Sequence, residues 1–220
     1  MEKRRRMMTV VITLMVLALT GVTAYYWYMQ AHYVETDDAR IEGSITYISP
    51  QITGKITAIY TAEGDYIREG DVIARQLDLG LTQGSNLDLA VMKSPVSGTI
   101  INKIGNVGEV GTPGQPVVMV CDLAKLFVTA DIEETKLHKV QAGQDVEFTV
   151  DAFPKVKLTG HVVSIANASM STFSLLPATN AGGSYTKAVQ RMPVKISIND
   201  YRGCRLLPGM NVVVKIHVAG

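Results

Sequence analysis

The sequence predicts a mainly β protein that is held in a membrane by one N-terminal transmembrane helix. Three observations support this prediction: an uncharged stretch of 23 residues at Met7–Met29, a glycine pattern that occurs twice, and short β-branched runs late in the chain. We expect the glycine repeat to form a small β-sandwich, and the later runs to form a small β-barrel with one short helix. The 19 glycines, 8 prolines and only 6% aromatic residues are typical of strands joined by tight turns.

The transmembrane helix is expected over residues 7–29. At about 1.5 Å per residue this stretch makes roughly 34 Å of helix, and a hydrocarbon core is about 30 Å thick. Residues 1–6 form a basic tail with four cations, which predicts a cytoplasmic N-terminus and places residues 30–220 outside the inner membrane. A single span excludes a transporter that forms a pathway alone. Since the chain has a net charge of +1 and the tail +3, the remainder carries −2, without the electrostatic signature of nucleic-acid binding.

The anchor runs from Met7 to Met29, and Trp27 lies near its end among the aromatic residues Tyr25–Tyr28. Such rings favour the headgroup layer, so we expect them to mark the outer leaflet. A cleaved signal peptide is the alternative. Its apolar core would exceed the usual length of about 7–15 residues, and cleavage would expose the aromatic row, so we favour a retained anchor.

The pattern G-x9-G-[DE]-x4-G occurs twice, 44 residues apart, and defines the sandwich. Each copy begins with a Ser-Pro pair, and its glycines separate short β-branched runs, so two strand–turn–strand units are expected to pack face to face. The glycines are expected at tight turns, where they supply positive φ angles. They are Gly54, Gly64 and Gly70 in the first copy and Gly98, Gly108 and Gly114 in the second. The expected core includes Ile56, Ile59, Ile73, Ile100, Ile104 and Val117.

This arrangement resembles the lipoyl or biotinyl fold, in which two similar halves make one sandwich. In carrier proteins of that fold, a lysine at the hairpin between the halves takes the prosthetic group, and Lys93 after Met92 is the candidate here. Lys93 directly precedes the Ser94-Pro95 pair that opens the second half, instead of standing on an exposed turn. We therefore favour a solvated strand lysine over a carrier and expect no cofactor.

Further segments extend the likeness: Val34–Ala39, Ile48–Gly54, Phe173–Ala181 and Val189–Val194, in this order behind the anchor. With them, the chain resembles the HlyD-type periplasmic adaptors, or membrane fusion proteins, and among these the EmrA-like branch. The resemblance implies a homo-oligomeric, non-enzymatic adaptor of the bacterial inner membrane. Its partner would be an inner-membrane exporter of the major facilitator class, for multidrug or small-molecule export. The alternatives are a biotinyl or lipoyl carrier and an envelope-binding module without a role in transport.

A full-length adaptor of this branch carries a long helical hairpin between its half-motifs, and that hairpin reaches an outer-membrane duct. Here residues 80–90 stand in its place, and even fully helical they would span only about 16 Å. Their glycines favour a loop. We therefore expect no direct contact with an outer-membrane duct, whether the chain is a natural short adaptor or a shortened variant.

After the anchor, the expected organisation is a juxtamembrane strand joining the barrel at residues 30–47, sandwich halves at 48–79 and 91–123 around the loop 80–90, and the barrel at 124–220. In the barrel, strand-like runs occur at residues 126–130, 146–150, 156–165, 188–198 and 211–218.

Asp131 is expected to cap the short helix, with Glu134 completing a capping box and the helix reaching about Val140. Residues 167–187 form a long polar loop, and loops of this length are usually functional or disordered. The resemblance favours an ordered loop that contacts the partner over a plain surface loop. The candidate contact residues are Phe173, Leu175, Leu176, Pro177 and Asn180.

The sequence offers little for catalysis or metal binding, because no nucleophile elbow, HExxH motif or phosphate-binding loop occurs. Asp37-Asp38 is the one paired carboxylate, which we interpret as solvated because nothing around it supplies a base partner. Cys121 is expected in the sandwich core, and a disulfide with Cys204 in the other domain is disfavoured. The histidines are scattered without metal-ligand spacing and are interpreted as structural: His32, His138, His161 and His217.

Overall fold

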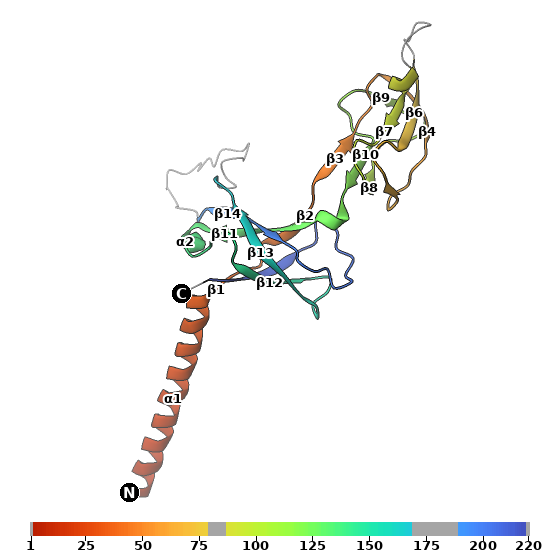
Figure 1. Ribbon diagram of the computed structural model, residues 1–220. Helices are drawn as coiled ribbons and strands as arrows, with labels where there is room; N and C mark the ends of the chain where they lie inside the picture. Colours follow the sequence, from red (N-terminus) through yellow and green to blue (C-terminus); the bar gives the residue numbers. More distant parts are fainter. Residues whose placement is uncertain (1, 79–86, 169–188, 219–220) are drawn as a thin grey trace, which may run out of the picture. The chain divides into compact units, whose positions relative to one another are not determined.

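The computed structural model describes residues 2–78, 87–168 and 189–218, and these are mainly β as predicted (Figure 1). The chain divides into two compact units, and each is described by itself. One comprises Met1–Arg40, Val128–Arg205 and Gly209–Gly220, and the other comprises Ile41–Phe127 and Leu206–Pro208.

Helix α1 (Glu2–His32) contains the expected membrane anchor. Within it, the 18 residues Val11–Tyr28 are long and apolar enough to cross a bilayer. The helix leads straight into β1 (Tyr33–Thr36), and the main-chain N–H of Val218 donates to the carbonyl of His32 at 2.9 Å. The end of the anchor is therefore joined to the barrel sheet by a backbone hydrogen bond.

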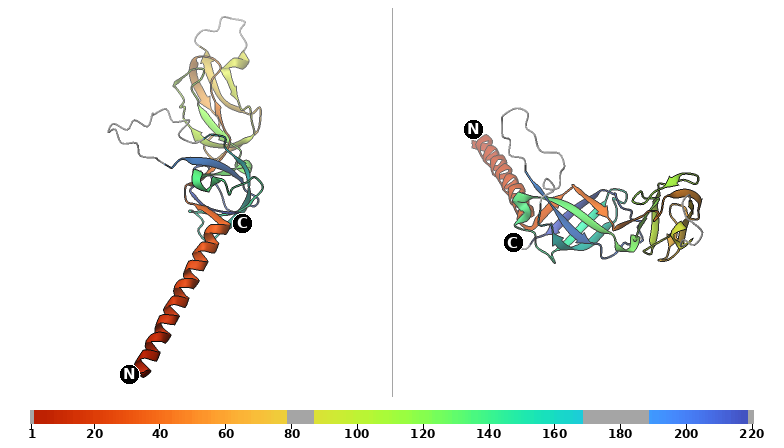
Figure 2. Two further views of the ribbon diagram at one scale, coloured as in Figure 1. Left: turned by 90° about the vertical axis from the view of Figure 1, so that its left-hand side faces the viewer. Right: turned by 90° about the horizontal axis from the view of Figure 1, so that it is seen from above.

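The first unit is built on a seven-stranded sheet that curls around its own core (Figures 1 and 2). Its alternating burial is that of strands with one face inward: Val146, Phe148 and Val150 of one strand are buried and face Val212 to Ile216 of the next. The strands, in spatial order, are β1, β15 (Val212–His217), β12 (Asp145–Val150), β13 (Lys157–Ile165), β14 (Arg191–Ser197), β11 (Phe127–Glu133) and β2 (Ala39–Glu42).

The short helix of this unit, α2 (Glu134–Leu137), corrects two expectations. Asp131 does not cap it: this residue lies in β11, buried, and its Oδ2 is 3.5 Å from Nη2 of Arg40 on β2. The residue before the helix is Glu133, whose side chain makes no capping hydrogen bond, and the helix ends at Leu137 rather than Val140. The local pattern predicted that the Asp131 carboxylate caps the helix, but this carboxylate forms a tertiary ion pair with Arg40 instead.

The second unit is the predicted sandwich of two four-stranded sheets, with strand orders β3-β10-β8-β5 and β7-β6-β4-β9. Ile45–Ile48 pairs with Val118–Cys121, so the sandwich begins before residue 48 and only the earlier part of residues 30–47 joins the barrel. The elements are β3 (Ile45–Ile48), β4 (Gly54–Ile59), β5 (Tyr66–Ile67), β6 (Val72–Asp78), β7 (Val91–Lys93), β8 (Gly98–Lys103), β9 (Val110–Gly111) and β10 (Val118–Cys121), with 3-10 helices at Leu87–Ala90 and Leu123–Lys125.

The two half-motifs exchange their shortest strands. β5 of the first half pairs with β8 of the second, and β9 of the second half pairs with β4 of the first. The backbone hydrogen bonds are reciprocal: the N–H of Ile56 donates to the carbonyl of Glu109 at 2.8 Å, and the N–H of Ile100 donates to that of Asp65 at 2.9 Å. Neither half can therefore complete its sheet without the other.

The predicted core is mostly confirmed. Ile56, Ile73, Ile100 and Val117 are buried, and Ile59 packs partly buried against them. The prediction of a buried Ile104 is wrong, because this residue is 44% exposed. It follows the end of β8, where the N–H groups of both Ile104 and Gly105 donate to the carbonyl of Val117, and this turn interrupts the alternation on which the prediction relied.

The repeat glycines have two different roles. Gly64, Gly70, Gly108 and Gly114 have φ between +86° and +96°, as expected of turn glycines. Gly54 and Gly98 are not turn residues: they begin β4 and β8. A Cβ at Gly54 would lie 2.6 Å from the carbonyl oxygen of Leu77, and one at Gly98 would lie 2.8 Å from that of Cys121, so a close backbone approach is what requires glycine there.

Candidate functional site

The barrel brings two of the segments that carry the family resemblance into contact. Nη1 of Arg191, at the start of β14, forms an ion pair with Oδ2 of Asp38, which lies between β1 and β2. Both side chains are about half exposed. Sequence reasoning placed Asp38 in a solvated carboxylate pair and missed Arg191, which stands 153 residues away. The available signal was that both residues belong to the segments noted for the resemblance.

The backbone around this ion pair is fixed by further hydrogen bonds. The N–H of Asp131 donates to the carbonyl of Asp38 at 2.8 Å, and the hydroxyl of Thr36 donates to the carbonyl of Asp131 at 3.1 Å. The N–H of Glu134 donates to the carbonyl of Gln190 at 2.9 Å. The chain thus enters β14 at a position held by β11, α2 and the β1–β2 connection.

A hollow beside this ion pair has a volume of about 60 Å³ and is lined by mixed charges that include Glu35, Lys136 and Arg191. Pockets that bind drug-sized molecules are usually about 300–1,000 Å³. The cluster therefore suits a positioning role better than binding of an exported compound. The five residues expected to contact a partner, Phe173 to Asn180, lie outside the described residues.

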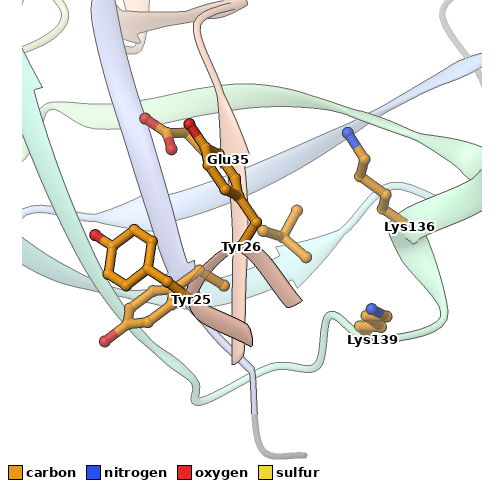
Figure 3. Close-up of a pocket in the computed structure, with 7 residues that line it drawn as sticks. Tyr25, Tyr26, Glu35, Lys136 and Lys139 are labelled. Atoms are coloured by element: carbon orange, nitrogen blue, oxygen red, sulfur yellow. The ribbon is translucent and has the colours of Figure 1, made fainter. Parts of the chain in front are cut away.

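A larger cavity, of about 350 Å³, lies where α1 meets the barrel (Figure 3). The end of α1 contributes Tyr25 and Tyr26, and the end of α2 with the turn after it contributes Lys136 and Lys139. Figure 3 shows the two lysines on one side of the space, with the tyrosines and Glu35 on the other. The first residues of β1 complete the lining: Tyr33, Val34 and Glu35.

Among the described residues, no group of three or more His, Cys, Asp or Glu side chains could hold a metal ion. His161 Nδ1 lies 2.8 Å from the hydroxyl of Ser197 on an exposed surface, and His217 packs its ring against Tyr33. Lys93 is exposed and pairs with Val72 within the β6–β7 ladder. It is a strand lysine, as predicted, and not a residue of a hairpin tip.

The two cysteines are free thiols and belong to different units. Cys121 is buried as expected, and burial together with the neighbouring charge of Asp122 raises the pKa of its thiol. A thiol that stays protonated is a poor nucleophile, which agrees with a packing role for this residue.

The comparisons with known proteins agree with this geometry. Residues 125–217 match the family model described as an AAEA-like beta-barrel domain. Over 218 residues the chain is 35% identical to YhbJ of Bacillus subtilis, a candidate efflux system component, and the alignment covers 98% of this chain and 94% of that protein.

Longer relatives match over part of their length. The colistin resistance protein EmrA of Acinetobacter baumannii is 37% identical over 145 residues, which are 64% of this chain and 40% of that protein. A solved structure of the periplasmic adaptor protein EmrA superposes with a TM-score of 0.57 over 86% of this chain and 99% of that one, and at 14% identity it supports the fold alone. The full-length match, the barrel match and the sandwich of two half-motifs show that the chain belongs to the HlyD-type membrane fusion proteins, in their EmrA-like branch.

Proposed function

We propose that this protein is the membrane-anchored adaptor subunit of an efflux system and that it assembles with an inner-membrane exporter of the major facilitator class. The strongest support is the match to YhbJ, a candidate efflux system component, over 98% of this chain and 94% of that protein. The relatives named as colistin resistance and multidrug export proteins support export of drug-like molecules. The basic residues that precede the apolar part of α1 support a cytoplasmic N-terminus and an extracytoplasmic location for both β units.

An adaptor of this kind acts by fit rather than by chemistry. The Asp38–Arg191 ion pair holds the start of β14 against the β1–β2 connection. That strand receives the chain from residues 167–187, so the ion pair would fix where the proposed contact loop returns to the barrel. Homo-oligomerisation through unlike surfaces would repeat this contact around the exporter.

The connection between the half-motifs limits how far the protein reaches. Residues 80–90 could add about 35 Å at most even if fully extended, and much less as a two-way connection. Their last part is the short 3-10 helix Leu87–Ala90, which leads directly into β7. We therefore propose transport across the inner membrane without direct docking to an outer-membrane duct.

Charge exchange at the ion pair tests this function. Asp38→Arg and Arg191→Asp should each lower drug efflux several-fold, because each places like charges together, and the double exchange should restore efflux. Glu147→Lys is a matched control, since Glu147 and Lys157 form an exposed pair at 3.9 Å in the same sheet. Expression and thermal stability are measured in parallel in cells that also carry a candidate exporter of the major facilitator class.

Two results would contradict the proposal. If deletion of the whole chain leaves efflux unaffected, the protein has no role in transport. If photo-crosslinking from position 191 captures no multi-span exporter in active cells, the proposed partner is wrong. The proposed topology is tested separately, because protease added to spheroplasts should digest both β units.

A further inference from the structure

The cavity in Figure 3 stands at a fixed distance from the end of the apolar span. The His32 carbonyl accepts from the N–H of Val218, and the β1–β15 ladder begins at the next residue, with Tyr33 opposite His217. Ring contacts reinforce this junction: Tyr28 stacks on His32 with centroids 4.2 Å apart, and Tyr33 meets His217 edge-on at 4.6 Å. No loop intervenes, so at about 1.5 Å per residue Tyr26 is only about 10 Å along the chain from Tyr33.

The aromatic side chains at this junction indicate the depth of the cavity in a membrane. Tyr25 and Tyr26, which line it, are 62% and 67% exposed, and Trp27 beside them is 73% exposed. Tyrosine and tryptophan side chains at the end of an apolar span favour the headgroup layer, where the ring is buried and its polar edge is hydrated. The cavity therefore opens at the level of the phospholipid headgroups.

The charges around the cavity favour a phosphate. Lys136 and Lys139 stand three residues apart on one side of it. The charge of Glu35 on the opposite side is offset by Lys215, whose Nζ lies 3.2 Å from Oε1 of Glu35. Lys136 Nζ lies 3.1 Å from the Glu133 carboxylate, but both side chains are more than 40% exposed, and such pairs are weak enough to exchange for another anion.

We propose that this cavity binds the phosphodiester headgroup of an anionic membrane phospholipid, with Lys136 and Lys139 as the phosphate ligands and the tyrosines against the glycerol region. Its volume of about 350 Å³ suits a headgroup. The lysines reach it along their apolar stems while their ammonium groups stay hydrated. Bound lipid would fix the barrel to the membrane surface independently of any exporter.

The single tryptophan of the chain, Trp27, provides a local probe. The full-length protein is placed in vesicles of phosphatidylcholine and phosphatidylglycerol in which only one of the two lipids carries brominated acyl chains. Quenching of Trp27 then measures which lipid is enriched beside it. We expect brominated phosphatidylglycerol to quench more strongly, with an enrichment of about fivefold for each lysine that contributes.

Lys136→Ala together with Lys139→Ala should abolish this enrichment, and the two Lys→Arg changes should retain it. The matched control is Lys155→Ala with Lys157→Ala, which removes the same charge from exposed positions of the same unit away from the cavity lining. Equal quenching by both lipids in the unmodified protein would overturn the proposal, as would an equal loss of enrichment in the control.

A third experiment distinguishes a membrane lipid from a soluble phosphate ester as the ligand of the cavity. If the detergent-solubilised full chain binds glycerol phosphate through the same two lysines, while vesicles show no preference for phosphatidylglycerol, the cavity is a site for a soluble phosphate ester and the lipid assignment is wrong. Crosslinking from position 136 to an exporter, at the expense of lipid, would likewise contradict it.

Discussion

The two halves of the sandwich have nearly the same backbone but different interiors. Their reciprocal hydrogen bonds agree closely: the N–H of Gly64 donates to the carbonyl of Ile100 at 2.8 Å, and the N–H of Gly108 donates to that of Ile56 at 2.8 Å. Gly54 and Gly98 each approach a carbonyl of the partner strand. The repeated residues are thus those that set the backbone path.

The side chains beside these glycines differ in size between the halves, so that a larger residue in one half stands opposite a smaller one in the other. Gly98 pairs with Ile67, and the nearby buried side chain is Val120. At the equivalent place Gly54 pairs with Gly111, and the buried side chain is Gln76, whose Nε2 donates to the carbonyls of Gly54 at 3.1 Å and Gly111 at 3.3 Å. One site is thus filled by the large Ile67 and the smaller Val120, and the other by the small Gly111 and the larger Gln76.

The next pair along the repeat differs in exposure rather than size. Cys121 is 1% exposed, whereas its counterpart Leu77 is 57% exposed. A Cβ on Gly43 would lie 2.5 Å from the Cys121 sulfur and 2.7 Å from Leu126, so the segments that lead into and out of the sandwich cover this cysteine. Internal similarity therefore predicts the shared backbone path, but not which side chains fill each half or what covers it from outside.

The largest expected effect is a charge placed in the shared core. Ile73→Asp and its counterpart Val117→Asp should each destabilise the unit by several kcal/mol, because both positions are buried and offer no partner for a carboxylate. Thermal unfolding of the full chain in detergent measures this. Ile104→Asp is the control and should cost less than about 0.5 kcal/mol at its exposed position. A mild effect at either core position would break the equivalence of the halves.

The second test separates the two roles of the glycines. Gly54→Ala and Gly98→Ala should each cost about 1–3 kcal/mol, since the new methyl group meets a main-chain carbonyl that cannot move aside. Gly64→Ala and Gly108→Ala should cost about 1–2 kcal/mol from the left-handed conformation alone, because nothing lies within 4 Å of a Cβ there. Chemical denaturation compares the four variants. Equal costs within each pair would support the comparison, and a tolerated Gly54→Ala would contradict it.

The third test exchanges the packing of the halves. Gln76→Val should cost about 1–3 kcal/mol, because two carbonyls lose their donor. Gly111→Ile alone should also destabilise, since a Cβ there would lie 2.7 Å from Nε2 of Gln76 and 2.8 Å from Pro50. The double variant reproduces the other half and should cost less than the sum of the single changes. Strict additivity would show that the two sites do not compensate.

Local sequence pattern predicted the features of the fold that do not depend on distant residues. The uncharged stretch predicted the anchor, and strand-like apolar runs predicted β11 to β15 of the barrel to within a few residues. The repeat predicted two similar units packed face to face, but it did not predict that β5 and β9 are exchanged between them. The number of short strand-like runs predicted the barrel, and the family resemblance predicted the adaptor role.

The failures share a physical cause, which is competition from distant residues. Asp131 fits a helix cap locally, but Arg40 on another strand pairs with it. Glycine at residues 54 and 98 is compatible with a turn or with close approach of strands, and only the partner strand decides between them. The Asp38–Arg191 pair and the cavity at the end of α1 join residues too far apart for any spacing rule to find.

The smallest expected effect lies in the turn that carries the acidic residue of each repeat. Asp65 Oδ2 accepts from the N–H of Ala62 at 2.7 Å, while Glu109 accepts both the side-chain amide and the N–H of Asn106 at 2.9 Å. These bonds, the side-chain one first, hold the pKa of Glu109 below its usual range. The stabilisation is therefore present above the ordinary glutamate pKa and is lost as the pH falls through the lowered value.

Carboxyl-carbon NMR titration of the full chain should show this lowered pKa, and Asn106→Ala should return it toward the ordinary value. Glu109→Gln keeps an acceptor for the Asn106 N–H but removes the charge, so it should flatten the acid dependence of unfolding while changing stability at neutral pH less than any variant above. Glu109 is fully exposed, which is why solvent screening keeps the effect small. An ordinary pKa for Glu109, or one that Asn106→Ala leaves unchanged, would mean that its longer side chain adds nothing to the turn that the shorter Asp65 does not already provide in the other half.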